Sequence, residues 1–330
     1  HAVQISVLLP SLGSPDRLAR CFDALGAQTL PSDRFEVLYC TNEKAGTHQA
    51  ARFRHVPSSA TSLAARRNAL LASANGDALL FLADDVVPLP DCLEGHLNAQ
   101  QALSGKPALV VGAAPAVIRL PDRLLDRVAR ETSLVSSLDQ MEKHSASIER
   151  DWSFRNALFL NVSIRAMDAA GMRFDESGEH SEYADLEWAW RVTSARSLPV
   201  VYRPQIRVRH DSRIEPDAFL DREYSRGMQA YHVGLRYPRF AKALFGREIG
   251  QADELRYSRA FVEAERGLAE QLRQELFALA EVSSDSATPQ AVESIYNEQS
   301  LLKRWTWRLG LIASANAARA VATSPLGLAA

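Results

Sequence analysis

The stretch that decides the fold lies at residues 64–88 and reads AARRNALLASANGDALLFLADDVVP. Its first half has apolar residues at helical spacing, which predicts a helix over residues 62–74 that an Asn-Gly pair ends. The apolar run at residues 78–82 predicts a buried strand, because it is short and bounded by turn-forming residues. This strand ends at Asp84 and Asp85, so the stretch predicts a helix, a strand and an acidic turn in succession. Such a succession is typical of α/β proteins.

Similar apolar runs flank this stretch on both sides. Residues 4–10 (QISVLLP) and 35–40 (FEVLYC) predict two strands, separated by a helix over residues 15–27 that begins with a proline. Residues 108–116 and 157–165 predict two more strands. Strands that alternate with helices predict a mostly parallel central sheet flanked by helices. In such a sheet, ligands bind beyond the carboxyl ends of the strands.

The last third of the chain has a different pattern. It reads as nearly all helix, with a heptad-like segment over residues 253–281 and a last helix that carries Trp305 and Trp307. We therefore expect a core domain over residues 1–212 and a helical C-terminal extension over residues 213–330. The tryptophan helix is compatible with packing in the core, with a homo-oligomer contact and with a peripheral membrane contact.

Composition narrows the class of protein. Hydrophobic residues make up 46% of the chain and charged residues 24%, which is typical of a globular protein. The net charge of −2 argues against a nucleic-acid partner. Cys21, Cys40 and Cys92 have no metal-ligand spacing and predict reduced thiols. No run approaches the roughly 20 apolar residues of a membrane span. We expect a cytoplasmic protein, with attachment at the inner face of the membrane as an alternative.

The acid pair at residues 84 and 85 is the first candidate site. Two carboxylates at the carboxyl end of a strand are hard oxygen ligands in the place where a ligand binds. They suit Mg²⁺ or Mn²⁺ bridging to a diphosphate. A solvated turn is the alternative, since Asp favours turns.

For three further residues, both a functional and a purely structural interpretation are compatible with the sequence. Asp185 begins a helix, where it can accept a proton from an attacking hydroxyl or can simply cap the helix. His210 ends a strand-like run and can complete a metal shell as a neutral imidazole, or can be a hydrogen-bonded structural residue. Arg67 lies on the side of its helix opposite an apolar stripe, and its structural interpretation is a solvated surface position. That stripe comprises Leu63, Leu70, Leu71 and Ala74.

Four segments in order resemble glycosyltransferase family 2 and its GT-A fold. They are VLLPSLGSPDRLARCFDAL at residues 7–25, AARRNALLASANGDALLFLADDVVP at residues 64–88, FLNVSIRAMDAAGMRFDES at residues 159–177 and YADLEWAWRV at residues 183–192. Together they cover roughly residues 3–212, and the set is far more specific than any one segment. The resemblance implies a GT-A, Rossmann-like α/β fold. It also implies a metal-dependent, inverting transfer of sugar from a nucleotide-diphosphate sugar to an acceptor hydroxyl, in glycan or polysaccharide biosynthesis.

The resemblance also implies a role for individual residues. Asp85 would hold the divalent cation, Mn²⁺ or Mg²⁺, and Asp84 would lie beside it on the metal or the ribose. Asp185 matches the family's catalytic base, and His210 matches a histidine that supports the metal in some relatives. The nucleotide and its diphosphate would contact Pro10, Ser11, Asn42 and Arg67. The sugar and acceptor pocket would be shaped by Asn161 and by the turn Phe174-Asp175-Glu176.

Some positions depart from the family pattern. Thr41 and Asn42 stand where the family usually places an Asp on the base or ribose, and Ala83 and Ala184 replace acids of two motifs. A degenerate nucleotide-sugar or carbohydrate-binding protein is therefore the alternative function. A nucleotidyltransferase would need a Gly-rich basic loop after the first strand, which Ser11-Leu12-Gly13-Ser14 is not. Acceptors compatible with the sequence are a glycan, a lipid-linked saccharide and a protein.

Overall fold

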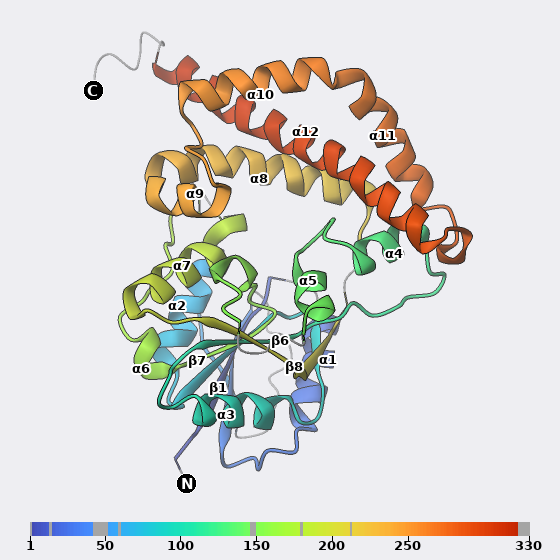
Figure 1. Cartoon of the computed structure of the whole chain (residues 1–330). Coiled ribbons are helices and arrows are strands. Elements are labelled where there is room, and N and C mark those ends of the chain that lie inside the picture. Colours follow the sequence, from blue (N-terminus) through green and yellow to red (C-terminus); the bar gives the residue numbers. More distant parts are fainter. Residues whose placement is uncertain are drawn as a thin grey trace. The chain divides into compact units, whose positions relative to one another are not determined.

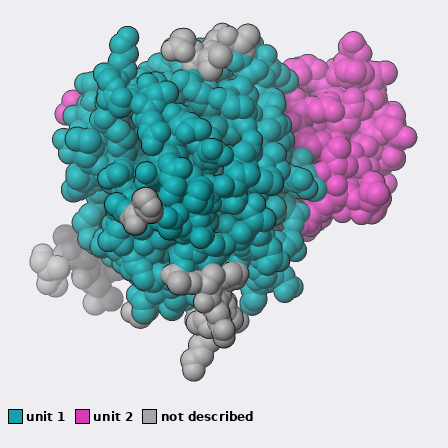
Figure 2. Space-filling model, turned by 90° about the horizontal axis from the view of Figure 1, so that it is seen from below, with its two compact units in different colours: residues 1–117, 138–178, 184–212 teal, residues 118–137, 179–183, 213–330 magenta. Residues whose placement is uncertain are grey.

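The computed structural model describes residues 2–12, 15–41, 52–58, 61–145, 150–178, 181–211 and 213–322. The chain forms two compact units, which Figure 2 colours separately. Unit 1 comprises His1–Val117, Leu138–Gly178 and Ala184–Ser212, and unit 2 comprises Ile118–Ser137, Glu179–Tyr183 and Arg213–Ala330. Unit 2 thus takes in two short segments that precede residue 212, and the sequence-based division at that residue stays a prediction.

Unit 1 is built on one eight-stranded sheet with the order β3-β2-β1-β4-β7-β6-β8-β5. Its strands are β1 (Ile5–Pro10), β2 (Phe35–Cys40), β3 (Phe53–His55), β4 (Ala78–Leu82), β5 (Val86–Pro88), β6 (Leu109–Ala113), β7 (Asn161–Arg165) and β8 (Val200–His210). Strands β3, β2, β1 and β4 run parallel, as does the β6–β8 pair. Strand β7 is antiparallel to both of its neighbours, and β5 is antiparallel to β8. The expected α/β class is confirmed, with a sheet in which parallel pairs predominate.

Helices cover both faces of this sheet (Figure 1). They are α1 (Pro15–Gly26), α2 (Leu63–Ser73), α3 (Cys92–Ala102), α5 (Leu138–Lys143), α6 (Ala166–Ala169) and α7 (Ala184–Arg196), with a 3₁₀ turn η1 (Phe154–Asn156). Leu80 of β4 belongs to one buried cluster with Phe22 of α1 and Leu93 of α3, so α1 and α3 share one face. Phe81 points to the opposite face, because side chains alternate along a strand. Its ring lies 5.5 Å from that of Trp188, which places α7 on that second face.

Helix α2 has the predicted bounds to within one residue, but its burial does not follow the apolar stripe alone. Within the stripe of Leu63, Leu70, Leu71 and Ala74, Leu70 is buried, whereas Leu63 is 36% exposed. Arg66, Arg67 and Asn68 are buried as well. The solvated position considered for Arg67 is therefore wrong. Apolar spacing fails here because the polar side of the helix faces partners at the carboxyl edge of the sheet, as described below.

Unit 2 is helical and forms the C-terminal extension expected from the sequence. Its elements are α4 (Leu124–Glu131), η2 (Ser181–Tyr183), α8 (Pro216–Arg236), α9 (Pro238–Phe245), α10 (Ala252–Ala264), α11 (Arg266–Leu279), η3 (Ser284–Ser286) and α12 (Pro289–Ala322). The heptad-like segment at residues 253–281 is two helices, α10 and α11, that meet at Glu265. Among the described helices, none has the length and apolarity to cross a membrane.

Two glycines let the long helices of unit 2 approach each other at the backbone. A Cβ on Gly227 of α8 would lie 1.8 Å from the carbonyl oxygen of Trp307 on α12. A Cβ on Gly310 of α12 would lie 2.0 Å from the carbonyl oxygen of Tyr224 on α8. Both distances are far below van der Waals contact, so only glycine fits at this crossing. The crossing fixes the position of Trp307 within unit 2.

Candidate functional site

The carboxyl ends of β1 and β4 meet at one edge of the sheet, because the two strands are parallel neighbours. Ser11 follows β1, and its Oγ donates a hydrogen bond of 2.5 Å to Oδ2 of Asp84, which follows β4. The carbonyl oxygen of Ser11 accepts a hydrogen bond from the Arg66 guanidinium of α2. Pro10 and Ser11 are both buried, so the predicted nucleotide-binding position of Ser11 is one that the fold holds rigidly.

Asp85 and His210 lie side by side although 125 residues separate them. The cause is the antiparallel pairing of β5 with β8, in which Val86 is opposite His210. The histidine Nε2 lies 3.2 Å from Oδ2 of Asp85. A backbone hydrogen bond of 2.8 Å from Asp211 N to Asp85 O fixes the same corner. The sequence-based pairing of these two residues at one site therefore has a geometric basis.

Asp85 is a half-buried carboxylate, and one of its two oxygens is buried without a partner among the described residues. Burial raises its pKa, but the hydrogen bond from His210 and the charges of His210 and Arg17 outweigh this, so the pKa is below its ordinary value. Its Oδ1 is buried and has no hydrogen-bond partner among the described residues. An ionised oxygen in this position lacks a cation or a donor. Asp85 therefore meets the chemical requirement for a cation ligand.

The protein ligands that a cation would find here are few. Within the described part of the chain, no group of three or more His, Cys, Asp or Glu side chains is placed to hold a metal ion. With the proton absent from His210 Nε2, Asp85 and His210 together offer two ligands, one carboxylate oxygen and one imidazole nitrogen. This fits a Mg²⁺-like or Mn²⁺-like ion, which is commonly bound by one or two carboxylates and completed by substrate phosphates and water. The residues present thus suit a cation that is shared with a bound diphosphate.

Asp185 lies in the first turn of α7 and is held by Arg67 of α2. Both guanidinium Nη atoms donate to the carboxylate, Nη1 to Oδ1 and Nη2 to Oδ2, the latter at 3.2 Å. The guanidinium also lies 5.3 Å from the ring centres of Phe159 and Phe174, which fixes its plane. The Asp185 side chain keeps 26% of its surface exposed, so a hydroxyl can reach it. Arg66 and Arg67 are neighbours, so α2 links the Ser11–Asp84 pair to Asp185.

The turn at residues 174–176 is fastened to the same helix. Asn68 of α2 accepts a hydrogen bond from Phe174 N and donates to Phe174 O, each at 2.8 Å. It also donates to Oε1 of Glu176 at 2.6 Å, while Asp175 Oδ1 accepts from Ser177 N. Phe174 is buried and Glu176 is exposed. Asp175 and Glu176 therefore lie on a turn that α2 positions, where their predicted substrate-binding role stays a prediction.

Asn161 lies inside the sheet, and its contacts favour a structural role. Its Nδ2 donates to Ala113 O at 3.2 Å and to Ile206 O at 3.1 Å, bridging β6 and β8 where their register shifts. Its Oδ1 lies 2.7 Å from His96 Nε2. Asn161 is 1% exposed. The predicted role in the sugar and acceptor pocket stays a prediction that these contacts do not support.

The structure brings most of the predicted residues to one edge of the sheet. Asn161 is opposite Leu82 at this edge, but its side chain is buried and bonded to neighbouring strands, and Asn42 lies outside the described residues. Two residues that support the site were not predicted from the sequence. One is Arg66, which holds the loop after β1. His96 supports Asn161, and burial lowers its pKa to about 4, so it is neutral. No spacing signal marks either residue, since their partners come from distant segments.

Part of the chain matches a known protein family, and the whole chain has distant structural similarities. Residues 6–127 match the family described as Glycosyl transferase family 2. No curated protein matches the sequence. Among solved structures, the chain is similar to the mannosyltransferase PcManGT from Pyrobaculum calidifontis in complex with GDP-Man and Mn²⁺. The identity is 15%, the coverage is 100% of this chain and 78% of that chain, and the TM-score is 0.46.

A second similarity is to S. aureus TarS 1–349 in complex with UDP, at 12% identity and a TM-score of 0.47, covering 96% of this chain and 92% of that chain. Both structural likenesses are distant, so only the family match bears on the function of the chain. That match includes Ser11, Asp84 and Asp85 at the edge of the sheet, with Arg67 between them in the chain. Residues 6–127 of the chain therefore match glycosyl transferase family 2.

Proposed function

We propose that this protein is a metal-dependent glycosyltransferase that transfers a sugar from a nucleotide-diphosphate sugar to an acceptor hydroxyl, with inversion at the anomeric carbon. The observation that carries the proposal is the ionised Asp85 beside His210, with a buried oxygen that has no partner among the described residues. It lies at the carboxyl edge of a sheet, where α/β proteins bind nucleotides. Mn²⁺ or Mg²⁺ and a place in glycan or polysaccharide biosynthesis belong to the same proposal.

Asp85 and His210 would hold the cation at the donor end of the site. When bound, the divalent ion supplies positive charge that stabilises the leaving diphosphate. Asp84 is held by Ser11, so its carboxylate stays at a fixed distance from the end of β1. This leaves Asp84 placed to orient the ribose or the cation. Because the β5–β8 pairing sets the position of Asp85 and His210, little has to rearrange when donor binds.

Asp185 would act at the acceptor end as the general base. The acceptor oxygen attacks the anomeric carbon, the bond from that carbon to the diphosphate breaks, and Asp185 accepts the hydroxyl proton. General-base assistance of this kind contributes roughly 10²–10⁴-fold. One attack from the face opposite the leaving group inverts the configuration. Product NMR that showed a retained anomeric configuration would contradict the proposal.

Arg67 takes a role that differs from the one implied by the resemblance. Its guanidinium is engaged with Asp185 and with two aromatic rings, rather than free to face a diphosphate. We assign it the positioning of Asp185, because two parallel hydrogen bonds fix both the place and the plane of the carboxylate. Arg67→Lys keeps the charge but removes this fork, so it should lower the turnover rate more than it weakens donor binding.

A thermal-shift screen tests the donor site directly. Wild type, Asp85→Asn and Asp23→Asn would be melted with UDP-, GDP- and dTDP-sugars, each with Mn²⁺ and with EDTA. Asp23 is an exposed residue of α1, so its variant controls for the loss of a carboxylate. A ligand that binds the native state raises the melting temperature by mass action. We expect a metal-dependent rise with one nucleotide class in wild type and Asp23→Asn, and none in Asp85→Asn.

Other outcomes would change the assignment. A rise that is equal with Mn²⁺ and EDTA would contradict metal dependence. Donor binding without any release of nucleotide, even with acceptor extracts present, would favour the degenerate binding protein. An absence of any shift with all three donor classes would remove the support for a donor site at Asp85.

A further inference from the structure

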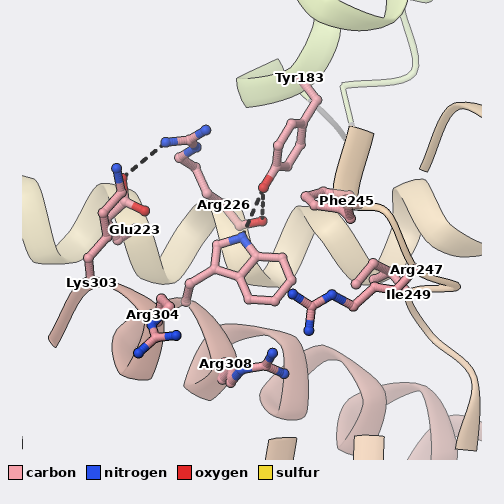
Figure 3. Close-up of a pocket in the computed structure, with 10 residues that line it drawn as sticks. Tyr183, Glu223, Arg226, Phe245, Arg247, Ile249, Lys303, Arg304 and Arg308 are labelled. Atoms are coloured by element: carbon pink, nitrogen blue, oxygen red, sulfur yellow. Dashed lines mark hydrogen bonds and ion pairs between the residues drawn. The ribbon is translucent and has the colours of Figure 1, made fainter. Parts of the chain in front are cut away.

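Unit 2 contains a pocket of about 260 Å³ that the proposed donor site does not use. Figure 3 shows it with Tyr183 and Phe245 close together above the long helices. Its walls come from η2, α8, α9, the segment after α9, and α12. The lining residues number ten: Tyr183, Glu223, Arg226, Phe245, Arg247, Ile249, Lys303, Arg304, Trp307 and Arg308. All of them belong to unit 2, so the pocket is complete within one unit.

The charge of this lining is strongly unbalanced. Five of its side chains are cationic, whereas Glu223 is its one carboxylate. Glu223 pairs with Arg226 at 3.1 Å. Outside the lining, Glu254 pairs with Arg308 at 2.7 Å and more loosely with Arg247 at 3.4 Å. Lys303 and Arg304 make no ion pair with any carboxylate of the described residues, so the pocket has a surplus of positive charge.

Two half-buried cations show that the surplus is not neutralised from within. Burial lowers the pKa of Lys303, and the charges of Arg226 and Arg222 lower it further against an opposing effect of Glu223. The Lys303 Nζ donates to the carbonyl oxygen of Leu134, a neutral partner. In Arg226, Nε is buried and has no hydrogen-bond partner among the described residues. Crowded cations with incomplete partners are stabilised when an anion enters.

An aromatic wall adjoins the cations. The Phe245 ring lies 5.6 Å from the rings of both Tyr183 and Trp307. Trp307 Nε1 donates to Tyr183 Oη at 3.0 Å, and Tyr183 Oη donates to Arg226 O at 3.0 Å. These bonds hold the rings in place before any ligand binds. Because the polar atoms of the rings are already bonded, the wall offers flat apolar surface to a ligand.

The size of the pocket limits what it can hold. Sites for drug-sized ligands have volumes of about 300–1,000 Å³, so 260 Å³ is too small to enclose a nucleotide sugar. It suits a single sugar ring with one anionic group. Arginine forks match the geometry of phosphate oxygens, and several of them with a lysine favour phosphate over a neutral hydroxyl.

We propose that this pocket binds a phosphorylated sugar, with the phosphate held by cations of the lining and the sugar ring against Trp307. The site needs no metal ion, in contrast to the donor site. The shared chemistry is a phosphate next to a sugar ring, which a free sugar phosphate and a phosphate-linked glycan both provide. The proposal concerns unit 2 alone and does not depend on the donor site.

Calorimetric titration in EDTA tests it, since EDTA removes any metal-dependent binding. The probes are glucose 6-phosphate, its methyl phosphodiester, inorganic phosphate and glucose. We expect glucose 6-phosphate or the diester to bind at least tenfold more tightly than inorganic phosphate, and glucose not to bind. Tighter binding of the monoester would indicate a free sugar phosphate as the natural ligand. Tighter binding of the diester would indicate a phosphate within a glycan chain.

Substitutions in the lining test whether the probes bind in this pocket. Arg247 and Arg304 are exposed, so the double substitution Arg247→Gln, Arg304→Gln should fold normally and weaken binding about tenfold or more. Lys303→Gln should weaken it similarly. The matched control is Arg256→Gln, Arg266→Gln, which removes two exposed arginines of unit 2 that do not line the pocket. We expect its binding to stay within twofold of wild type, and Asp85→Asn to change nothing.

Three results would overturn the proposal. One is an equal loss of affinity in the control and the pocket variants, which would mean general surface attraction. Another is equal affinity for inorganic phosphate and the sugar phosphates, which would leave no role for the aromatic wall. The third is wild-type affinity in both pocket variants.

Discussion

Two carboxylates at opposite ends of the same sheet, Glu36 and Asp85, differ in how completely the fold bonds them. Glu36, near the amino end of β2, accepts hydrogen bonds from Ser6 Oγ at 2.7 Å, Asn75 N at 2.8 Å and Arg54 Nη2 at 3.1 Å. Asp85, at the carboxyl end beyond β4, has His210 at 3.2 Å, and its Oδ1 has no partner among the described residues.

The difference separates a structural carboxylate from one that is ready for a ligand. Burial raises the pKa of each, and in each the partners outweigh it and lower the pKa below its ordinary value. In Glu36, the charge is balanced by hydrogen bonds that folding itself provides. In Asp85, an ionised oxygen remains buried without a donor, which is costly unless a cation binds. Removing the first should harm stability, and removing the second should harm binding.

The largest expected effect comes from Asp185, which departs from the rule that a fully bonded carboxylate is only structural. Its two oxygens are held by Arg67, yet we assign it a chemical role. Asp185→Asn should lower the rate of transfer by about 10²–10⁴-fold, because an amide cannot accept the proton. Donor affinity should change little. Nucleotide-release kinetics and donor titration would measure the two effects, and normal turnover in Asp185→Asn would show that the base is another residue.

The next effect concerns the cation at Asp85. Asp85→Asn should weaken Mn²⁺ binding in the presence of nucleoside diphosphate by about a hundredfold, since loss of a ligand's supporting partner alone costs about 10–100-fold. His210→Gln should cost about tenfold. Calorimetric titration of Mn²⁺ would measure both. The comparison predicts that Asp85→Asn leaves the melting temperature of the ligand-free protein unchanged or raises it. A large fall would mean that Asp85 is structural.

A smaller effect is expected where Asn161 bridges β6 and β8. A Cβ on Gly112 would lie 2.1 Å from Asn161 Nδ2 and 2.5 Å from Ile206 O, so Gly112→Ala must displace the bridge. We expect a loss of about 1–3 kcal/mol in the free energy of unfolding. Gly105→Ala is the matched control, because a Cβ there meets nothing within 4 Å. Urea denaturation would compare them, and equal stability of the two variants would contradict the assigned role of Asn161.

The smallest effect is the contribution of Glu36. Glu36→Gln should lower the free energy of unfolding by about 1–2 kcal/mol, because charge-assisted hydrogen bonds become neutral ones. The pKa of Glu36 in the folded protein lies below its ordinary value of 4.5. Its stabilisation is therefore present above pH 4.5 and is lost as the pH falls through the lower, folded-state pKa. Urea midpoints at pH 7 and in acid would show it, and an equal pH dependence in wild type and Glu36→Gln would contradict it.

The sequence predicted the core strands well because their signal is local. Apolar runs such as residues 78–82 became buried strands, and the acids after them came to the carboxyl edge. Helix α2 shows where this reasoning ends. Leu70 of its apolar stripe is buried, but so are Arg66, Arg67 and Asn68, because their partners belong to segments up to 118 residues away. Long-range pairing of this kind leaves no spacing pattern in a single sequence.

The pairing of Asp85 with His210 was partly predictable from the sequence. Each residue stood at the end of a strand-like run, but only the β5–β8 register brings them together. The aromatic and basic pocket of unit 2 was not predictable as a pocket. Its cations and rings come from four helical elements and the segment after α9, which are far apart in the sequence.

The most direct test of the account compares nucleotide release from the preferred donor in three proteins: wild type, Asp85→Asn and Glu36→Gln. The assay contains Mn²⁺ and runs well below the melting temperature of each. We predict that Glu36→Gln releases nucleotide at close to the wild-type rate, and that Asp85→Asn releases almost none. Release by Asp85→Asn at the wild-type rate would contradict the assignment of the unpartnered carboxylate as the cation ligand.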